Sequence, residues 1–475
     1  MDVEIVRDGA ERATVFTVTG VAVGTQPTPD DAAGRGCGWS ATFDVAVGDD
    51  WRSGLYLVTM AGPDGSVSHA SFVVRSPRQR RSGAVLVVAT STWNAYNEWG
   101  GPNLYQGAHE VSFERPWVAG YLDRPDEPEG RHATLGPEPD PASTALLDYL
   151  ERHGLSMRCV EAGWAGWERR FVRWAESRGW RIDIAQSTDL HDDPSALDGY
   201  AVVISVGHDE YWSAPMRDTV ESFVAEGGNA VFLSGNTSFW QVRYEGPTMV
   251  AHKYLAPWED PVVGTIEEHT MTGMWSDPVI GRPENQMTGV SFTRGGYARM
   301  GYAMPRGSGG YTVWRPKHWV FDGCDLRYGD LIGSTPVVVG YEADGGELRW
   351  GDGLPEPTST DGTPPGMVVL ATSPAHLWSS TPEGGVEVPA FQDHPPEVPA
   401  DLEYVTFRLL GDMRPENTAR LAAGNAVLGT FQRPGEGTVF TVGCTDWAHG
   451  LDPVPDDIIS GITTNLLENL GATRS

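Results

Sequence analysis

The sequence predicts an α/β protein whose sheet is mostly parallel, of the Rossmann-like or amidotransferase-like type, and carries β-rich insertions. A small N-terminal β-sandwich-like domain is expected to precede this sheet. Three observations lead to the prediction. Apolar and polar residues alternate over residues 12–76, apolar runs alternate with helix-like stretches from residue 83, and residues 260–400 are rich in Gly and Pro with short strand-like runs. Two-residue alternation is typical of half-exposed strands, and continuous apolar runs are typical of strands buried on both faces.

The first 80 residues are expected to form the β-sandwich-like domain. Its predicted strands are RATVFTVTGVAV, WSATFDVAV, GLYLVTMAG and SVSHASFVVRS, and the turn GPDG between the last two indicates a hairpin. A basic, polar segment, PRQRRSG, follows these strands. The change of pattern after it predicts a domain boundary near residue 80, with an α/β domain over residues 81–475.

Strands and helices are expected to alternate in the second domain. The predicted strands are GAVLVVAT, WRIDIAQ, YAVVISVG and NAVFLSGN, and the predicted helices include WERRFVRWAESRG, APMRDTVESFVAEGG and a final one near DDIISGITTNLLENLG. Strand–helix–strand units imply right-handed crossovers between parallel strands.

Bulk properties narrow the classes of function. The chain of 475 residues has a formal net charge of −30, which argues against nucleic-acid and anionic-membrane partners because both surfaces would repel it. Four cysteines lie far apart without a C-x-x-C pair, which favours reduced thiols in the cytoplasm. The charged N-terminus predicts no signal peptide, and no apolar stretch has the length of a membrane span.

Polar and aromatic residues follow three of the predicted strands. The segments are STWNAYNEWGGPNLY, GHDEYW and NTSFW. In open parallel sheets, the ligand crevice lies beyond the carboxyl ends of the strands, so these segments are expected to meet there. His208 and Glu210 are two residues apart and face the same side of an extended chain, where they can supply metal ligands or an acid/base pair. The alternative is that Asp209 or Glu210 only favours the start of the next helix.

The remaining candidates also have ordinary structural explanations. Tyr96 and Tyr105 flank the turn WGGPN and can be wall residues with hydrogen-bonded hydroxyl groups. Asn236 follows a glycine at a strand end, where asparagine often caps the next turn. No G-x-S-x-G elbow, equivalent cysteine elbow, H-E-x-x-H helix or P-loop is present, so a nucleophilic enzyme of those types is not predicted.

The combination of motifs is more specific than its parts. STWNAYN, GGPNLY, SVGHDEYWS, GGNAVFLSGNTSFWQVR, VAHKY, EDP, HWVF and VGYEADG occur in one order. The order and the residues of these motifs resemble those of the large (β) subunit of N,N-dimethylformamidase and its relatives, over residues 83–470. GHDEYW, with FLSGN in the following strand, is the most distinctive part.

The resemblance implies a mononuclear Fe(III) centre, held by two tyrosines and one glutamate, that hydrolyses a small amide at its C–N bond. Matched by motif, Glu210 is the glutamate ligand and Tyr96 the first tyrosine. Tyr105 is the second tyrosine ligand, with Tyr121 as the alternative. Hard cations prefer oxygen donors such as carboxylate and phenolate, so this ligand set is chemically consistent with ferric iron.

The resemblance also implies catalytic positions around the iron. His208 and Asn236 match polar groups of the family's site, and Lys253 of HKY and Glu342 of GYEADG match further active-site positions. We expect His208 or Glu342 to move protons and Asn236 to donate a hydrogen bond to the developing oxyanion.

The family's large subunit is longer than this chain, with a lectin-like domain that has no expected counterpart here, and it works with a small subunit. The sequence leaves open a small subunit, a homo-oligomer and the physiological amide. It also leaves two alternative functions: a non-catalytic α/β module that binds a carbohydrate or polymer, and a zinc-dependent hydrolase that uses His208 and Glu210.

Overall fold

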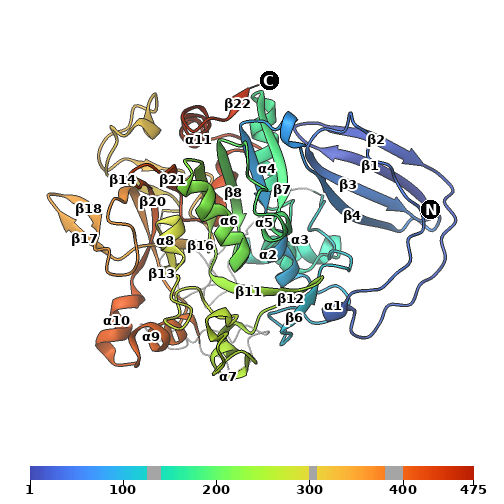
Figure 1. Cartoon of the computed structure of the whole chain (residues 1–475). Helices are drawn as coiled ribbons and strands as arrows, with labels where there is room; N and C mark the ends of the chain where they lie inside the picture. The colour runs from blue at the N-terminus through green and yellow to red at the C-terminus, as the bar shows by residue number, and fades with distance from the viewer. Residues whose placement is uncertain (126–140, 299–307, 380–399, 475) are drawn as a thin grey trace.

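A ten-stranded sheet forms the centre of the computed structural model, which describes residues 1–125, 141–298, 308–379 and 400–474 (Figure 1). Its strands lie in the order β15 (Leu331–Ile332), β14 (Tyr311–Val313), β19 (Val368–Ala375), β20 (Gly424–Gln432), β21 (Thr438–Thr441), β10 (Asn229–Gly235), β8 (Val202–His208), β5 (Ala84–Val88), β7 (Trp180–Gln186) and β22 (Thr473–Arg474).

The prediction of a mostly parallel sheet is wrong. The four neighbouring pairs from β21 to β7 are parallel, whereas the four pairs from β15 to β21 and the pair β7–β22 are antiparallel. The sheet is therefore mixed. Strands β15, β14, β19, β20 and β21 extend the sheet as antiparallel neighbours instead of packing on it as insertions. A central antiparallel strand that is buried on both faces has the same continuous apolar pattern as a parallel strand, and periodicity cannot separate the two.

The first strands form one sheet, where a sandwich was predicted. They are β1 (Asp2–Asp8), β2 (Arg12–Val18), β3 (Gly54–Ala61) and β4 (Val67–Val74), all antiparallel, in the order β2-β1-β3-β4. The hairpin at GPDG joins β3 and β4 as expected. The predicted strand WSATFDVAV is not formed: residues 39–47 contain no strand in the structure.

The partner layer of this N-terminal sheet is the α/β unit. Leu55 and Leu57 belong to the same buried cluster as the central sheet, and Arg7 forms an ion pair with Glu176 of α4 (Glu168–Ser177). The opposite face of the sheet is covered by its own aromatic residues, with Trp51 stacked on Tyr56. One side of the sheet is thus already buried, which removes the need for a second sheet.

The larger predicted helices are confirmed. Ser213 accepts a hydrogen bond from the Met216 N–H and so caps α6 (Ala214–Ala225), and Asp456 caps α11 (Asp457–Asn469) in the same way. The other helices are α1 (Ala32–Arg35), α2 (Thr90–Tyr96), α3 (Pro141–His153), α5 (Ser187–Asp192), α7 (Ala256–Glu259), α8 (Asn285–Thr288), α9 (Asp401–Leu410) and α10 (Pro415–Ala422). Within the described parts of the chain, none of these helices is long and apolar enough to cross a bilayer.

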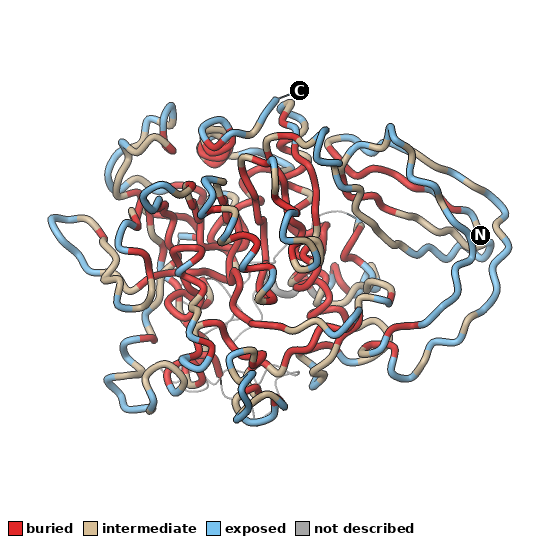
Figure 2. The backbone as a smooth tube through the Cα atoms, in the orientation of Figure 1, coloured by how far each residue is buried: buried red, intermediate tan, exposed pale blue. Residues whose placement is uncertain are grey.

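A small second sheet lies beyond the carboxyl ends of the parallel strands. It consists of β6 (Glu110–Ser112), β12 (Thr248–Val250), β11 (Trp240–Glu245) and β9 (Tyr211–Ser213). Two further pairs, β13 (Ser291–Tyr297) with β16 (Glu342–Gly345) and β17 (Leu348–Gly351) with β18 (Leu354–Pro357), complete the strands. Figure 2 shows that the central sheet and the segments beyond its strand ends are the most deeply buried part of the chain.

Candidate active site

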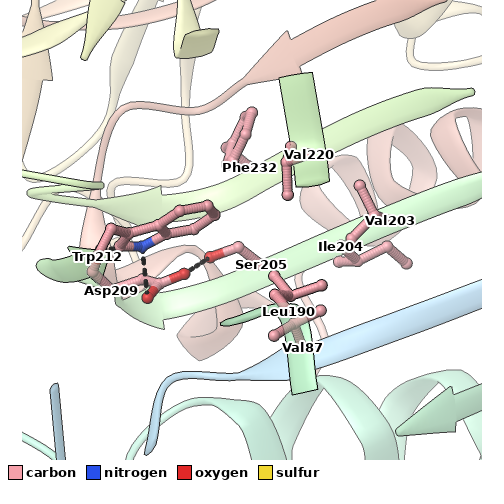
Figure 3. Close-up of a pocket in the computed structure, with 9 residues that line it drawn as sticks. All are labelled: Val87, Leu190, Val203, Ile204, Ser205, Asp209, Trp212, Val220 and Phe232. Carbon is pink, nitrogen blue, oxygen red and sulfur yellow. Dashed lines mark hydrogen bonds between the residues drawn. The ribbon is translucent and has the colours of Figure 1, made fainter. Parts of the chain in front are cut away.

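The end of β8 directs alternate side chains to opposite sides. His208 and Glu210 face the same way, with Nε2 of His208 3.3 Å from Oε2 of Glu210. Asp209 points to the other side, where it accepts hydrogen bonds from Ser205 Oγ at 2.7 Å and Trp212 Nε1 at 2.9 Å, beside a small apolar pocket (Figure 3). Burial raises the pKa of Asp209 to about 6. Of these side chains, only His208 and Glu210 are available to a site at the strand ends.

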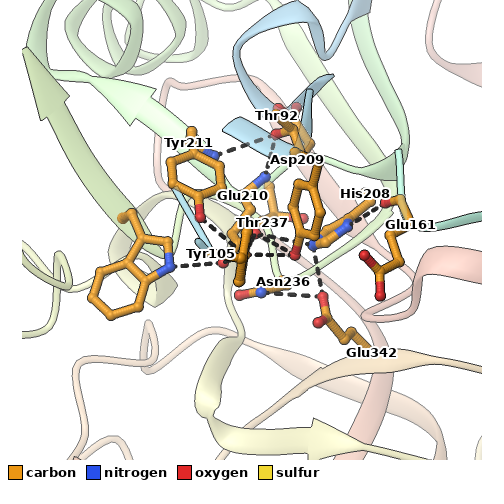
Figure 4. A network of polar contacts seen from close by, with 12 residues as sticks. Thr92, Tyr105, Glu161, His208, Asp209, Glu210, Tyr211, Asn236, Thr237 and Glu342 are labelled. Atoms are coloured by element: carbon orange, nitrogen blue, oxygen red, sulfur yellow. Dashed lines mark hydrogen bonds and ion pairs between the residues drawn. The ribbon is translucent and has the colours of Figure 1, made fainter. Parts of the chain in front are cut away.

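Two tyrosine hydroxyl groups meet at the carboxylate of Glu210. The Tyr96 hydroxyl, at the end of α2, donates a hydrogen bond of 3.0 Å to Oε2 of Glu210. The Tyr105 hydroxyl lies 2.6 Å from the Tyr96 hydroxyl and 2.9 Å from the same carboxylate oxygen. Tyr96 and Glu210 are each 3% exposed, so bulk water contributes little to their environment. Figure 4 shows Tyr105, Glu210, His208, Asn236 and Glu342 directed toward one another.

The electrostatics of this oxygen cluster favour a bound cation. Burial and the Glu210 carboxylate raise the pKa of Tyr96 and Tyr105 well above the ordinary value. Burial acts to raise the pKa of Glu210 too, but the hydrogen bond and charge of His208, with the charge of Lys253, lower it. The two phenols are therefore neutral beside an ionised carboxylate, and they become phenolates only if a cation sits among them.

A second group of polar side chains borders the cluster. Nε2 of His208 lies 2.6 Å from Oε2 of Glu342, and its Nδ1 lies 2.9 Å from the Glu161 carbonyl oxygen. Asn236 Nδ2 donates a hydrogen bond of 3.1 Å to the same Glu342 oxygen. Burial lowers the pKa of His208, but Glu342 and Glu210 outweigh it and raise that pKa well above the ordinary value. His208 and Glu342 thus form a buried pair that can hold a proton between them.

The backbone at Asn236 is held in an unusual conformation. Its φ is +51°, in the left-handed region, and its N–H and that of Thr237 donate hydrogen bonds of 2.9 and 3.0 Å to the two carboxylate oxygens of Asp344. Asparagine tolerates this region better than most residues. β16, which carries both Asp344 and Glu342, therefore fixes the orientation of the Asn236 side chain as well as contacting it.

Lys253 completes the site from the segment that follows β12. Its Nζ lies 3.2 Å from the centre of the Tyr105 ring, and burial lowers its pKa to about 7. The predicted residues Tyr96, Tyr105, His208, Glu210, Asn236, Glu342 and Lys253 are thus brought together. The alternative ligand Tyr121 is not in this group: its ring stacks on Trp117, and its buried hydroxyl has no hydrogen-bond partner among the described residues.

The sequence analysis did not predict the contacts that Trp240 and Tyr211 make in the site. Trp240 Nε1 donates a hydrogen bond of 2.7 Å to Oε1 of Glu210, and the Tyr211 hydroxyl lies 2.9 Å from that of Tyr105. β9 and β11 pair in parallel with Tyr211 opposite Trp240, which places both rings against the oxygen cluster. The only sequence signal is that each aromatic residue closely follows a strand that ends at the site.

Comparison with known proteins places the chain in a family. Residues 3–460 match the family model described as N,N-dimethylformamidase beta subunit-like, C-terminal. The chain belongs to this family. It is 27% identical over 372 residues to the N,N-dimethylformamidase beta subunit of Paracoccus aminophilus, and 26% identical over 377 residues to that of Alcaligenes sp. Each alignment covers 72% of this chain and 45% of the relative, so the chain spans about half the length of these curated relatives.

The family resemblance inferred from the motifs is confirmed by these matches. A metal ion can be tested against the residues present. Hydroxyl and carboxylate oxygens from Tyr96, Tyr105 and Glu210 lie 2.6 to 3.0 Å apart in a buried position, an all-oxygen donor set of the kind that hard cations prefer. As two phenolates and one carboxylate, these groups carry three negative charges. The donor set therefore fits a trivalent hard cation.

Proposed function

We propose that this member of the N,N-dimethylformamidase beta subunit-like family hydrolyses small amides, with Tyr96, Tyr105 and Glu210 holding one Fe(III) ion. The convergence of three oxygen donors, two from the buried Tyr96 and Glu210 and one from the half-buried Tyr105, is the observation that carries the proposal. When bound, ferric iron supplies a Lewis acid that polarises a carbonyl group and lowers the pKa of water. An amide needs such activation because its resonance weakens the carbonyl as an electrophile and its amine leaves poorly.

The surrounding residues supply the proton transfers. His208 and Glu342 lie 2.6 Å apart and are buried, so a proton taken from water can be held between them and returned to the departing amine nitrogen. Glu342 would share this proton with His208 while it also accepts the hydrogen bond from Asn236 Nδ2. In the proposed reaction the second N–H of Asn236 Nδ2 donates to the developing oxyanion, a contact that typically contributes about 3 kcal/mol to the transition state.

Aromatic side chains limit the size and polarity of the substrate. Trp240 and Tyr211 contact the oxygen cluster through their polar atoms while their rings remain buried, which favours a small and partly apolar amide. Lys253 covers the Tyr105 ring and offers a cationic or neutral amine next to the cluster. Because the curated relatives are named beta subunits, association with a non-identical subunit is part of the proposal.

The test measures iron binding and amide hydrolysis in matched tyrosine variants. N,N-dimethylformamide is the first substrate, and release of dimethylamine is the assay. We expect Tyr96→Phe and Tyr105→Phe to lose iron and hydrolysis. Tyr121→Phe is the matched control, because this tyrosine is buried as Tyr96 is but lies outside the cluster, and it should keep both.

Two outcomes would contradict the proposal. If Tyr121→Phe loses iron while Tyr105→Phe keeps it, the second ligand is wrongly assigned. If the iron-loaded chain, tested alone and with a candidate partner subunit, hydrolyses none of a series of small amides, the activity is wrong. The zinc-dependent and the non-catalytic binding alternatives remain predictions that the same metal analysis distinguishes from this one.

A further inference from the structure

A second cluster of metal-ligating side chains lies outside the candidate active site. His109, His252 and Glu259 each offer one ligand atom, and all three atoms lie within 4.8 Å of one another. Nε2 of His109 is 3.5 Å from Oε2 of Glu259, and the two imidazole rings are stacked with centroids 4.6 Å apart. Two ligands of one tetrahedral ion with bonds of about 2.0–2.1 Å are about 3.4 Å apart, so the first pair already has the required separation.

The three residues come from two segments joined by backbone hydrogen bonding. His109 immediately precedes β6, and its carbonyl oxygen accepts a hydrogen bond of 2.9 Å from the Ala251 N–H, next to His252. Glu259 is the last residue of α7, seven positions after His252. The main-chain contact fixes the two histidines side by side, while the side chains of His109 and Glu259 are 35% and 50% exposed and can adjust around an ion.

The chemistry of the cluster is suited to a metal rather than to a structural ion pair. Nδ1 of His252 is buried and has no hydrogen-bond partner among the described residues, which leaves that polar atom unsatisfied. Two imidazoles and one carboxylate form a ligand set used for zinc, with a fourth position left for water.

We infer that His109, His252 and Glu259 form a second metal site, which binds a divalent transition-metal ion of the zinc class at the surface. This site differs in chemistry from the oxygen-only cluster of Tyr96, Tyr105 and Glu210, which favours a harder cation. It does not depend on the proposed amide hydrolysis.

The second site lies where a bound ion would hold two segments of the chain together. His109 is four residues after Tyr105, and His252 directly precedes Lys253, whose Nζ covers the Tyr105 ring inside the protein. An ion bound at the surface by His109 and His252 would therefore link the same two segments that contact each other inside the protein through Tyr105 and Lys253. Lys253 has a φ of +54°, a conformation that needs support from its surroundings.

The test is zinc binding by the iron-loaded full chain, measured by equilibrium dialysis and metal analysis. We expect the wild type to bind one zinc equivalent more than His109→Ala or His252→Ala, and Glu259→Gln to bind that zinc at least ten-fold more weakly. His269→Ala is the matched control, since it removes an exposed histidine of the following segment and should behave like the wild type.

A second measurement separates lost binding from lost folding. Zinc should raise the thermal midpoint of the wild type and of His269→Ala, but not that of His109→Ala, while the zinc-free midpoints of all three remain the same. Equal zinc stoichiometry in the wild type, His109→Ala and His252→Ala would overturn the inference. Because the comparison uses no substrate and requires only that the variants share one iron content, it can succeed even if the proposed function fails.

Discussion

The Tyr96 hydroxyl lies 3.0 Å from Oε2 of Glu210, although 114 residues separate the two in the chain. Tyr96 ends α2, which begins just after β5, and Glu210 follows β8, the parallel neighbour of β5 in the central sheet. The contact therefore depends on the parallel pairing of two strands and on the residues directly after each of them. The other donors join at this point, so the whole site is a product of strand order.

Trp240 is predicted to tune the metal site through Glu210. Trp240→Phe removes the 2.7 Å hydrogen bond to Oε1 of Glu210, and loss of such a supporting contact typically weakens metal binding by about 10–100-fold. Competition with an iron chelator measures this change. Trp275→Phe is the control, since Trp275 is equally buried but its Nε1 has no hydrogen-bond partner among the described residues. Equal iron affinity in both variants would show that Glu210 is oriented without Trp240.

Asn236 is predicted to act on the reaction and not on the metal. Asn236→Ala should lower kcat by about 100-fold, the effect of losing one oxyanion donor, while iron stays bound. The φ of +51° adds backbone strain to an alanine, so Asn236→Gly is needed beside it. Both variants should lose the same activity. Loss of iron from either one would place Asn236 in metal binding.

Gly207 is predicted to be indispensable for the geometry of the β8 end. Its φ is +86°, and a Cβ here would lie 2.5 Å from the Cβ of Trp167. Gly207→Ala should therefore cost about 1–3 kcal/mol more than Gly199→Ala, which has a φ of +82° but open space around it. Urea unfolding of the two variants measures the difference. Equal free energies of unfolding would mean that Trp167 moves aside without cost.

Asp260 is predicted to make stability fall in acid. Burial acts to raise its pKa, but hydrogen bonds from Arg243 and Thr272 lower it to about 2. A carboxyl group whose pKa is lower in the folded state contributes stability above its unfolded pKa of about 3.9, here about 2 kcal/mol, and loses it as the pH falls toward 2.

Asp260→Asn removes this titration. The wild type should therefore exceed the variant in free energy of unfolding at pH 6, and this excess should shrink by about 1 kcal/mol at pH 3. Urea unfolding at the two pH values is the measurement. An excess that does not change with pH would contradict the assigned hydrogen bonds.

The sequence was most informative where one buried strand leads directly into a polar segment. β5, β8 and β10 are continuous apolar runs, and the residues that follow them, including Tyr96, Glu210 and Asn236, meet as the strand-end rule requires. Tyr105 was matched through the family resemblance, and the structure places its hydroxyl against Tyr96. The family itself was recognised from the order of the motifs and is confirmed.

Strand direction and partner layers could not be obtained in the same way. β19 and β20 pair antiparallel in the middle of the sheet, where burial on both faces gives the apolar pattern expected of parallel strands. The alternation of β3 indicates one buried face but not what covers it, which is why a sandwich was expected where the α/β unit packs. The roles of Trp240 and Tyr211 depend on the register of β9 with β11, a long-range pairing that local sequence does not encode.

Iron analysis together with the visible absorption spectrum of the purified chain tests the central claim most directly. We predict one iron per chain and a phenolate-to-iron charge-transfer band that colours the protein, both lost in Glu210→Gln and kept in Tyr121→Phe. A colourless protein that takes up no ferric iron, or one in which Glu210→Gln leaves the band unchanged, would contradict the assignment of Tyr96, Tyr105 and Glu210 as the metal ligands.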